Sequence, residues 1–185
     1  MKNPHDMNNA MQKIRLTSIL VLLLGLTACQ DMPPMATVAH VDLKRFLGNW
    51  YIIGSIGIFV EKGAHNAVES YALNPDGTIA TIFTFHAGSF DGDLRRYTPT
   101  GFVLDKNTSA TWGMQFIWPI KADYRIIYLA DDYSLTVIGR KKRDYVWIMA
   151  RTPKISDANY QRALQFIGAQ GYDIHQVQKV PQKWQ

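Results

Sequence analysis

Between residues 49 and 151 the chain alternates apolar and polar positions in short runs, which is the pattern of half-buried β-strands. The predicted strands cover about 49–56, 66–73, 78–86, 94–104, 109–117, 123–130, 133–140 and 144–151. Polar turns separate them, and the strongest is Asn74-Pro75-Asp76-Gly77. Because no long crossover interrupts the series, we predict an all-β fold, an eight-stranded up-and-down antiparallel β-barrel.

The pattern changes to a helical period after the last of these strands. Ser156 is a good N-cap, and the apolar residues Tyr160, Ala163, Leu164 and Ile167 recur on one helical face. Gly168 or Gly171 can end this helix. We therefore predict one C-terminal flanking α-helix outside the barrel, followed by a short strand within 173–179.

The N-terminal segment has the pattern of an export signal. Lys13 and Arg15 precede an apolar run over 16–26, which is shorter than the roughly 20 residues that span a bilayer. The sequence Leu26-Thr27-Ala28-Cys29 resembles a bacterial lipobox, in which an acylated Cys29 becomes the mature N-terminus. We predict a lipoprotein signal peptide at 1–28, an acylated N-terminus and linker at 29–41, and a barrel domain at 42–185. Ordinary secretion with an incidental Cys29 is the alternative.

Composition excludes several classes of function. The net charge of +5 is modest and no dense Lys/Arg run occurs, so nucleic-acid binding is not expected. Lipidation of the single cysteine, Cys29, leaves no thiol or disulfide chemistry. The histidines lack metal-ligand spacing, and no glycine-rich phosphate loop or Gly-x-Ser-x-Gly motif is present. We predict no catalytic residue, cofactor or metal.

Several motifs in order resemble the lipocalin family, closest to bacterial lipoprotein lipocalins and their apolipoprotein D-type relatives. They are Gly48-Asn49-Trp50-Tyr51, Glu61-Lys62-Gly63, the segment 124–129, and the long segment 144–156. The resemblance implies that Trp50, after Gly48, plugs the closed end of the barrel and that Arg151 stacks across it. Ile52 departs from the Glu common in bacterial relatives, and 55–58 is unusually apolar near the expected mouth.

Strand alternation predicts which side chains point into the barrel. If Arg151 meets Trp50, then Tyr145, Trp147 and Met149 share its side. The complete predicted ligand-binding set is Phe83, Phe85, Trp112, Met114, Phe116, Trp118, Tyr124, Ile126, Tyr128, Tyr145, Trp147 and Met149. An apolar interior of this kind suits an acyl chain, although the same aromatics could fill a solid core.

Hairpin order places a group of cations at the mouth of the barrel. We expect Lys121, Arg140, Lys141, Lys142 and Arg143 there, as headgroup contacts for a phosphate or carboxylate. The alternative is a charged hairpin tip that only keeps the barrel soluble.

These resemblances, to lipocalins and to bacterial lipoproteins with a non-acidic residue such as Gln30 after the cysteine, imply a lipid-anchored lipocalin of the bacterial outer membrane, facing the periplasm. Its predicted ligand is a small apolar molecule, a fatty acid or lysophospholipid as the resemblance implies, which it binds, stores or transports. An envelope interaction module with a filled barrel and a lipocalin-type enzyme are the alternatives. Homodimer formation is left open.

Overall fold

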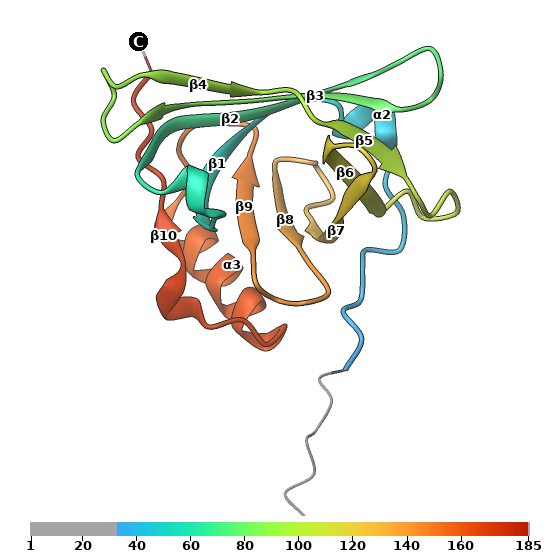
Figure 1. Cartoon of the computed structure of the whole chain (residues 1–185). Helices are drawn as coiled ribbons and strands as arrows, with labels where there is room; N and C mark the ends of the chain where they lie inside the picture. The colour runs from blue at the N-terminus through green and yellow to red at the C-terminus, as the bar shows by residue number, and fades with distance from the viewer. Residues whose placement is uncertain (1–32, 185) are drawn as a thin grey trace, which may run out of the picture. The chain divides into compact units, whose positions relative to one another are not determined.

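The computed structural model describes residues 33–184, shown in Figure 1, and the predictions for the signal peptide and Cys29 lie outside these residues. Its strands are β1 Gly48–Ile56, β2 Ala64–Leu73, β3 Ile79–Ala87, β4 Leu94–Tyr97, β5 Thr100–Val103, β6 Thr111–Ile117, β7 Ile120–Leu129, β8 Leu135–Gly139, β9 Val146–Ala150 and β10 Gln178–Lys179. Its helices are α2 Leu43–Phe46 and α3 Asp157–Ala169, with 3₁₀ turns η1 Phe59–Glu61 and η2 Ile174–Gln176.

The strands form one antiparallel sheet that closes on itself. From β1 to β9 the strands pair in chain order, except that β5 follows β3 in the sheet and β4 pairs with β3 alone. β1 also pairs with β9, with Tyr51 opposite Ala150 and Ile56 opposite Val146, and β10 pairs with β1. This pairing confirms the predicted closed eight-stranded barrel. The predicted strand at 94–104 is divided into β4 and β5 around Pro99, whose ring nitrogen has no hydrogen to donate; β3 pairs with both pieces.

The turn between β2 and β3 has the geometry that its sequence predicts. Gly77 donates its N–H to the Asn74 carbonyl at 3.0 Å and has φ +81°, which favours glycine. The Asp76 carboxylate accepts a hydrogen bond from the Thr78 N–H at 2.9 Å. These bonds fix the register of the hairpin.

The short helix α2 closes one end of the barrel, and the sequence pattern did not predict it. Asp42 caps it by accepting from the Lys44 N–H at 2.9 Å, and Phe46 is completely buried. The Trp50 indole donates to the Phe46 carbonyl at 2.8 Å. A single turn of helix has too little periodicity to stand out in the sequence.

Arg151 covers this plug from outside, as the resemblance implies. Its guanidinium carbon lies 3.8 Å from the centre of the Trp50 ring. It also donates to the carbonyls of Asn49 at 2.9 Å and Phe46 at 3.0 Å. Gly48, at φ +93°, places the chain close beneath the guanidinium. The cation therefore joins the start of β1, the end of β9 and α2.

Two apolar clusters lie on opposite sides of the barrel wall. One fills the interior around Trp50, Trp112 and Phe85. The other lies between the outer face of β7–β9 and α3, where Tyr160, Ala163 and Ile167 are buried as predicted. Ser156 caps α3 by accepting from the Asn159 N–H at 3.2 Å. The helix thus packs outside the barrel.

Residues 34–42 form a strap along the barrel, and residues 34–41 of this strap belong to the segment that was predicted as a linker. Met35 and Val41 are buried, and the Val38 N–H donates to the Ile126 carbonyl at 3.0 Å. The Val41 N–H donates to the Thr108 carbonyl at 2.7 Å. The strap therefore runs from the outer cluster to α2 as part of the fold.

Replacing Arg151 with Ala should lower the free energy of unfolding by on the order of 2–4 kcal/mol, because it removes the indole stack and the carbonyl contacts together. Arg162→Ala, on the exposed face of α3, is the matched control and should change it by less than about 0.5 kcal/mol. Urea unfolding measures both, and equal effects would contradict this role of Arg151.

Candidate ligand-binding cavity

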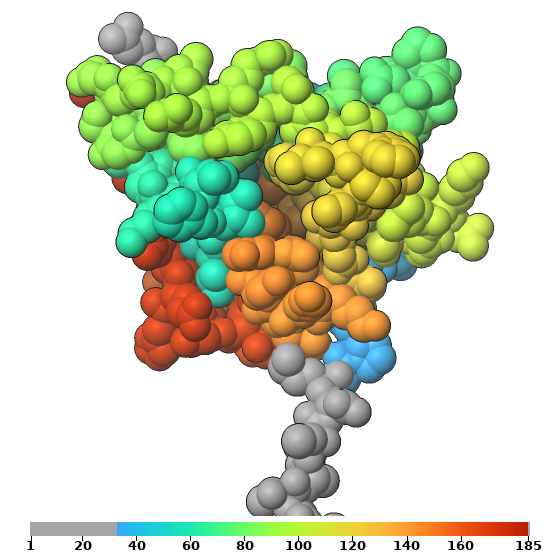
Figure 2. Space-filling model, viewed as in Figure 1, coloured from blue at the N-terminus to red at the C-terminus, as the bar shows by residue number. Residues whose placement is uncertain are grey.

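The barrel contains a small inner cavity that continues into a wider apolar groove. The cavity measures about 80 Å³ and the groove about 450 Å³. They share four lining residues, Ile58, Glu61, Phe83 and Phe116. Figure 2 shows the hollow between the η1 loop, the β6–β7 hairpin and the β8–β9 loop. The cavity and the groove therefore form one continuous recess at the open end of the barrel, where a small ligand could bind.

A buried aromatic layer forms the floor of this recess. The rings of Trp112 and Tyr124 stack with centres 5.4 Å apart, and Tyr71 meets Trp112 edge-on at 5.6 Å. The Tyr71 and Tyr124 hydroxyls are 2.6 Å apart and hydrogen-bonded. Burial raises the pKa of both phenols well above the ordinary value, so both hydroxyls stay protonated. Below them Phe46 and Trp50 close the barrel.

Most of the predicted interior residues face inward. Those that line the cavity are Phe83, Met114, Phe116, Tyr124, Tyr145 and Trp147, with Phe116 at its entrance. Those that belong to the packed interior cluster without lining the cavity are Phe85, Trp112, Ile126 and Met149. Trp112, Ile126 and Met149 fill the lower barrel. Phe85 lies nearer the mouth than Phe83 on β3 and packs against Phe83 and Tyr97, with ring centres 5.3 Å and 6.2 Å away.

Tyr128 and Trp118 do not face the interior, so their predicted orientation is wrong. A bulge between Ile126 and Tyr128 breaks the alternation of β7, and Tyr128 packs outside against Phe166 of α3 at 5.4 Å. Trp118 lies in the β6–β7 turn and is 82% exposed. A second bulge, between Met114 and Ile117, precedes that turn. Strict alternation fails at both sites.

Of the predicted headgroup cations, only Arg140 lines the cavity. Its guanidinium lies 5.0 Å from the Tyr145 ring centre and pairs with Asp144 at 3.3 Å. Lys121 instead covers Phe102 at 3.6 Å, and Arg143 donates to the Gln170 carbonyl beyond α3. Lys141 and Lys142 are exposed on the β8–β9 loop. The five cations therefore do not form one site.

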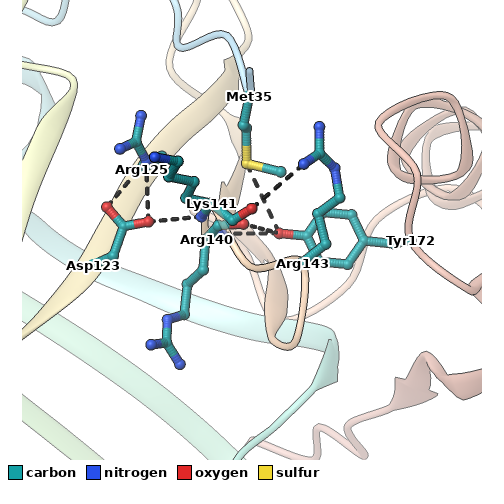
Figure 3. Close-up of polar contacts among 7 residues, drawn as sticks. All are labelled: Met35, Asp123, Arg125, Arg140, Lys141, Arg143 and Tyr172. Atoms are coloured by element: carbon teal, nitrogen blue, oxygen red, sulfur yellow. Dashed lines mark hydrogen bonds and ion pairs between the residues drawn. The ribbon is translucent and has the colours of Figure 1, made fainter. Parts of the chain in front are cut away.

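Two elements hold the β8–β9 loop from opposite sides (Figure 3). On one side Asp123, paired with Arg125 at 3.0 Å, accepts the Lys141 N–H at 2.6 Å. On the other the Tyr172 hydroxyl accepts the Arg140 N–H at 2.8 Å. This clamp fixes the backbone from which Arg140 reaches the cavity.

Two glutamates, Glu61 and Glu69, also line the cavity, although neither belongs to the predicted ligand-binding set. Glu61 accepts a hydrogen bond from the Trp147 indole at 2.9 Å. Glu69 lies in register between Trp50 on β1 and Phe83 on β3, both of which face inward. The sequence held one signal of this orientation. Glu69 lies two residues before Tyr71, and in an alternating strand two such side chains point to the same face.

Burial dominates the electrostatics of these glutamates. It raises the pKa of the Glu69 carboxyl to about 7, against a smaller opposing effect of a hydrogen bond with Tyr71. It likewise raises the pKa of Glu61 to about 7, opposed by the Trp147 hydrogen bond. The recess therefore holds two carboxyls that change charge near neutral pH.

Within residues 33–184 no group of His, Asp or Glu has the arrangement of a metal site. His65 and His86 each place Nδ1 within 2.9 Å of a local carbonyl, those of Gly63 and Gly92. Among the same residues no helix is both long enough and apolar enough to cross a bilayer.

The fold and its plugged, open-mouthed recess define the class of protein. A family model described as a lipocalin-like domain matches residues 41–182. The chain belongs to the lipocalin family.

The chain is similar in sequence to named lipocalins, and in fold to a solved structure. It is 30% identical over 160 residues to temperature-induced lipocalin-1 of Arabidopsis thaliana, covering 80% of this chain and 83% of that protein. It is 29% identical over 150 residues to the outer membrane lipoprotein Blc of Escherichia coli K12, covering 80% and 84%. Insecticyanin of the tobacco hornworm has the same fold, with a TM-score of 0.64 at 11% identity over 84% of this chain and 87% of that one.

Glu69→Gln should change how stability depends on pH. A carboxyl with a pKa of about 7 when folded and an ordinary value of 4.5 favours the folded state fully below pH 4.5, and this contribution is lost as the pH rises through 7. Glutamine has no carboxyl to ionise, so it does not lose this contribution. The free energy of unfolding of the variant, relative to wild type, should therefore rise by on the order of 3 kcal/mol between pH 4.5 and pH 8.

Thermal unfolding of both proteins across this pH range measures the difference. Asp157→Asn, at a side chain that is 98% exposed, should follow wild type at every pH. A Glu69→Gln curve parallel to wild type would show that Glu69 is ionised in the folded barrel.

Proposed function

We propose that the protein binds a single-chain amphiphile, a fatty acid or lysophospholipid, in the recess of its barrel. The observation that carries this proposal is the continuous apolar recess, which enters the barrel from its open end. The names of its relatives are consistent with a lipocalin that works in a cell envelope. The predicted absence of enzymatic activity stays a prediction.

The geometry supports entry of the acyl tail first. The tail would lie in the groove beside Val60, Tyr97 and Ile117 and end in the cavity above Tyr124. Each buried methylene contributes about 0.8 kcal/mol before the entropic cost of binding. Because the aromatic floor is filled, the tail stops there and the headgroup stays near the mouth.

Arg140 is the residue best placed to meet an anionic headgroup. It lines the cavity, and its buried Nε has no hydrogen-bond partner among the described residues. A phosphate or carboxylate oxygen would satisfy this donor. Glu61 in the same recess disfavours a second negative charge beside it when ionised, so binding of an anion should strengthen as the pH falls below 7.

The small inner cavity also supports a second candidate function. With the lower barrel filled by Phe46, Trp50 and Trp112, the domain would be an envelope interaction module that holds no ligand. Occupancy of the recess separates the two functions.

The first experiment is native mass spectrometry of a chain that begins at Gln30, which contains every described element, purified without detergent. Extraction of bound lipid should give a stoichiometric fatty acid or lysophospholipid. Ala122→Phe should abolish the adduct, because Ala122 lines the cavity and the ring would fill it.

Ala158→Phe makes the same change on the exposed face of α3 and should leave the adduct intact. Near-ultraviolet circular dichroism checks that both variants fold. A wild-type chain that stays free of ligand across a lipid panel would favour the interaction module.

We further propose that Cys29 is acylated and anchors the protein to the outer membrane, facing the periplasm. The lipobox at 26–29 and the non-acidic Gln30 support this. In bacteria expressing the full chain, the wild type should incorporate labelled palmitate and stay in carbonate-washed membranes. Cys29→Ser should lose the label and be released by the wash, and retention of the label would contradict acylation at this residue.

A further inference from the structure

Large apolar side chains gather on two loops beside the recess. Phe59 is 90% exposed and Trp118 is 82% exposed, and the smaller neighbours are also open to solvent. We call this set the apolar rim: Phe59 and Val60 of the η1 loop, with Phe116, Ile117, Trp118 and Ile120 of the β6–β7 hairpin. Exposed apolar groups in such number mark an interaction surface.

The apolar rim surrounds the entrance of the recess. Val60, Phe116 and Ile117 line the groove themselves, and Figure 2 shows the η1 loop and the β6–β7 hairpin on opposite sides of the hollow. The other exposed large apolar residues are scattered over the described surface. Leu73 and Leu104 stand near turns of the closed end, Leu94 begins β4, and Ile174 and Trp184 belong to the C-terminal segment. A partner that covers the rim would therefore also cover the opening.

The N-terminal strap begins at the same end of the barrel. Met35 Sδ lies 3.9 Å from the Tyr172 hydroxyl, which itself bonds to Arg140 of the mouth loop (Figure 3). Met35 is six residues after Cys29, and six extended residues reach at most about 20 Å. An acyl group on Cys29 is thus tethered to the mouth end rather than to the plugged end.

The exposed charges at the mouth complement an anionic surface. Lys62, Lys141 and Lys142 are exposed on the mouth loops, against Asp91, Asp93 and Asp144, and Lys121 is exposed at the start of β7. Asp93 is already paired with Arg95 at 3.3 Å. Lysines beside protruding apolar side chains are the combination that binds the headgroup and acyl layers of an anionic bilayer together.

We propose that the apolar rim docks the mouth of the barrel onto an anionic phospholipid bilayer, with the aromatic tips in the acyl layer. The recess then opens directly toward the lipid, so an amphiphile passes between bilayer and barrel without crossing water. The orientation on the protein's own membrane rests on the proposed acylation of Cys29, whereas docking itself does not.

The test is flotation of the non-acylated chain beginning at Gln30 with vesicles of phosphatidylethanolamine containing about 30% phosphatidylglycerol. The wild type should float, and less so without phosphatidylglycerol or in high salt. Phe59→Ser with Trp118→Ser should weaken binding by about tenfold or more. Leu73→Ser with Leu104→Ser, the matched control at the closed end, should bind as wild type does.

Brominated acyl chains provide a second readout, because they should quench tryptophan fluorescence in the wild type and less so in Trp118→Phe. Failure of the wild type to float, or equal loss in both double variants, would overturn the proposal. A dimer in sedimentation velocity that only the Phe59/Trp118 variant disrupts would assign the rim to a second copy of the chain. Native mass spectrometry detects lipid bound in the recess whether or not the protein docks on vesicles. The proposed function and the proposed docking are therefore tested separately.

Discussion

The contact between Arg151 and Trp50 is the point on which the closed barrel depends. A sheet becomes a barrel only if its first and last strands meet, and here β1 and β9 pair along most of their length. The guanidinium lies on the seam that this pairing makes and bonds to carbonyls on its far side. It covers the indole, which fills the barrel beneath it. The Arg151 side chain thus contributes to the pairing of β1 with β9, to the closure of the barrel end and to the position of α2.

Because packed side chains close one end of the barrel, the other end does not need to be tightly packed. The lower barrel is filled by aromatic rings, whereas the upper barrel contains Glu61, Glu69 and a recess. Buried carboxyls without a cationic partner cost stability, and the solid floor and the outer cluster under α3 offset that cost. The molecule is therefore divided along its axis into a part that maintains the fold and a part whose chemistry is open to a ligand.

The sequence predicted the architecture well because turns and alternation are local signals. The structure has the expected N-cap of α3 at Ser156, the expected turn at Asn74–Gly77 and the expected order of strands. The interior was less predictable. Tyr128 was assigned to the wrong face because a bulge depends on the pairing of neighbouring strands, which one strand's sequence does not reveal. Glu69 was overlooked because a charged residue argues against burial unless its paired strands are known.

The bulge in β7 has a consequence for how such barrels diversify. It presents two consecutive residues, Ile127 and Tyr128, to the helix-covered outer face. Deleting one of these two residues would restore the two-residue period without turning any other residue, because Ile126 and Leu129 on either side of the pair already face the interior. Where the alternation of a strand is regular, the same deletion would turn every residue on one side of it to the opposite face. The bulge is therefore a place where the length of β7 can change beneath the helix while the lining of the barrel stays the same.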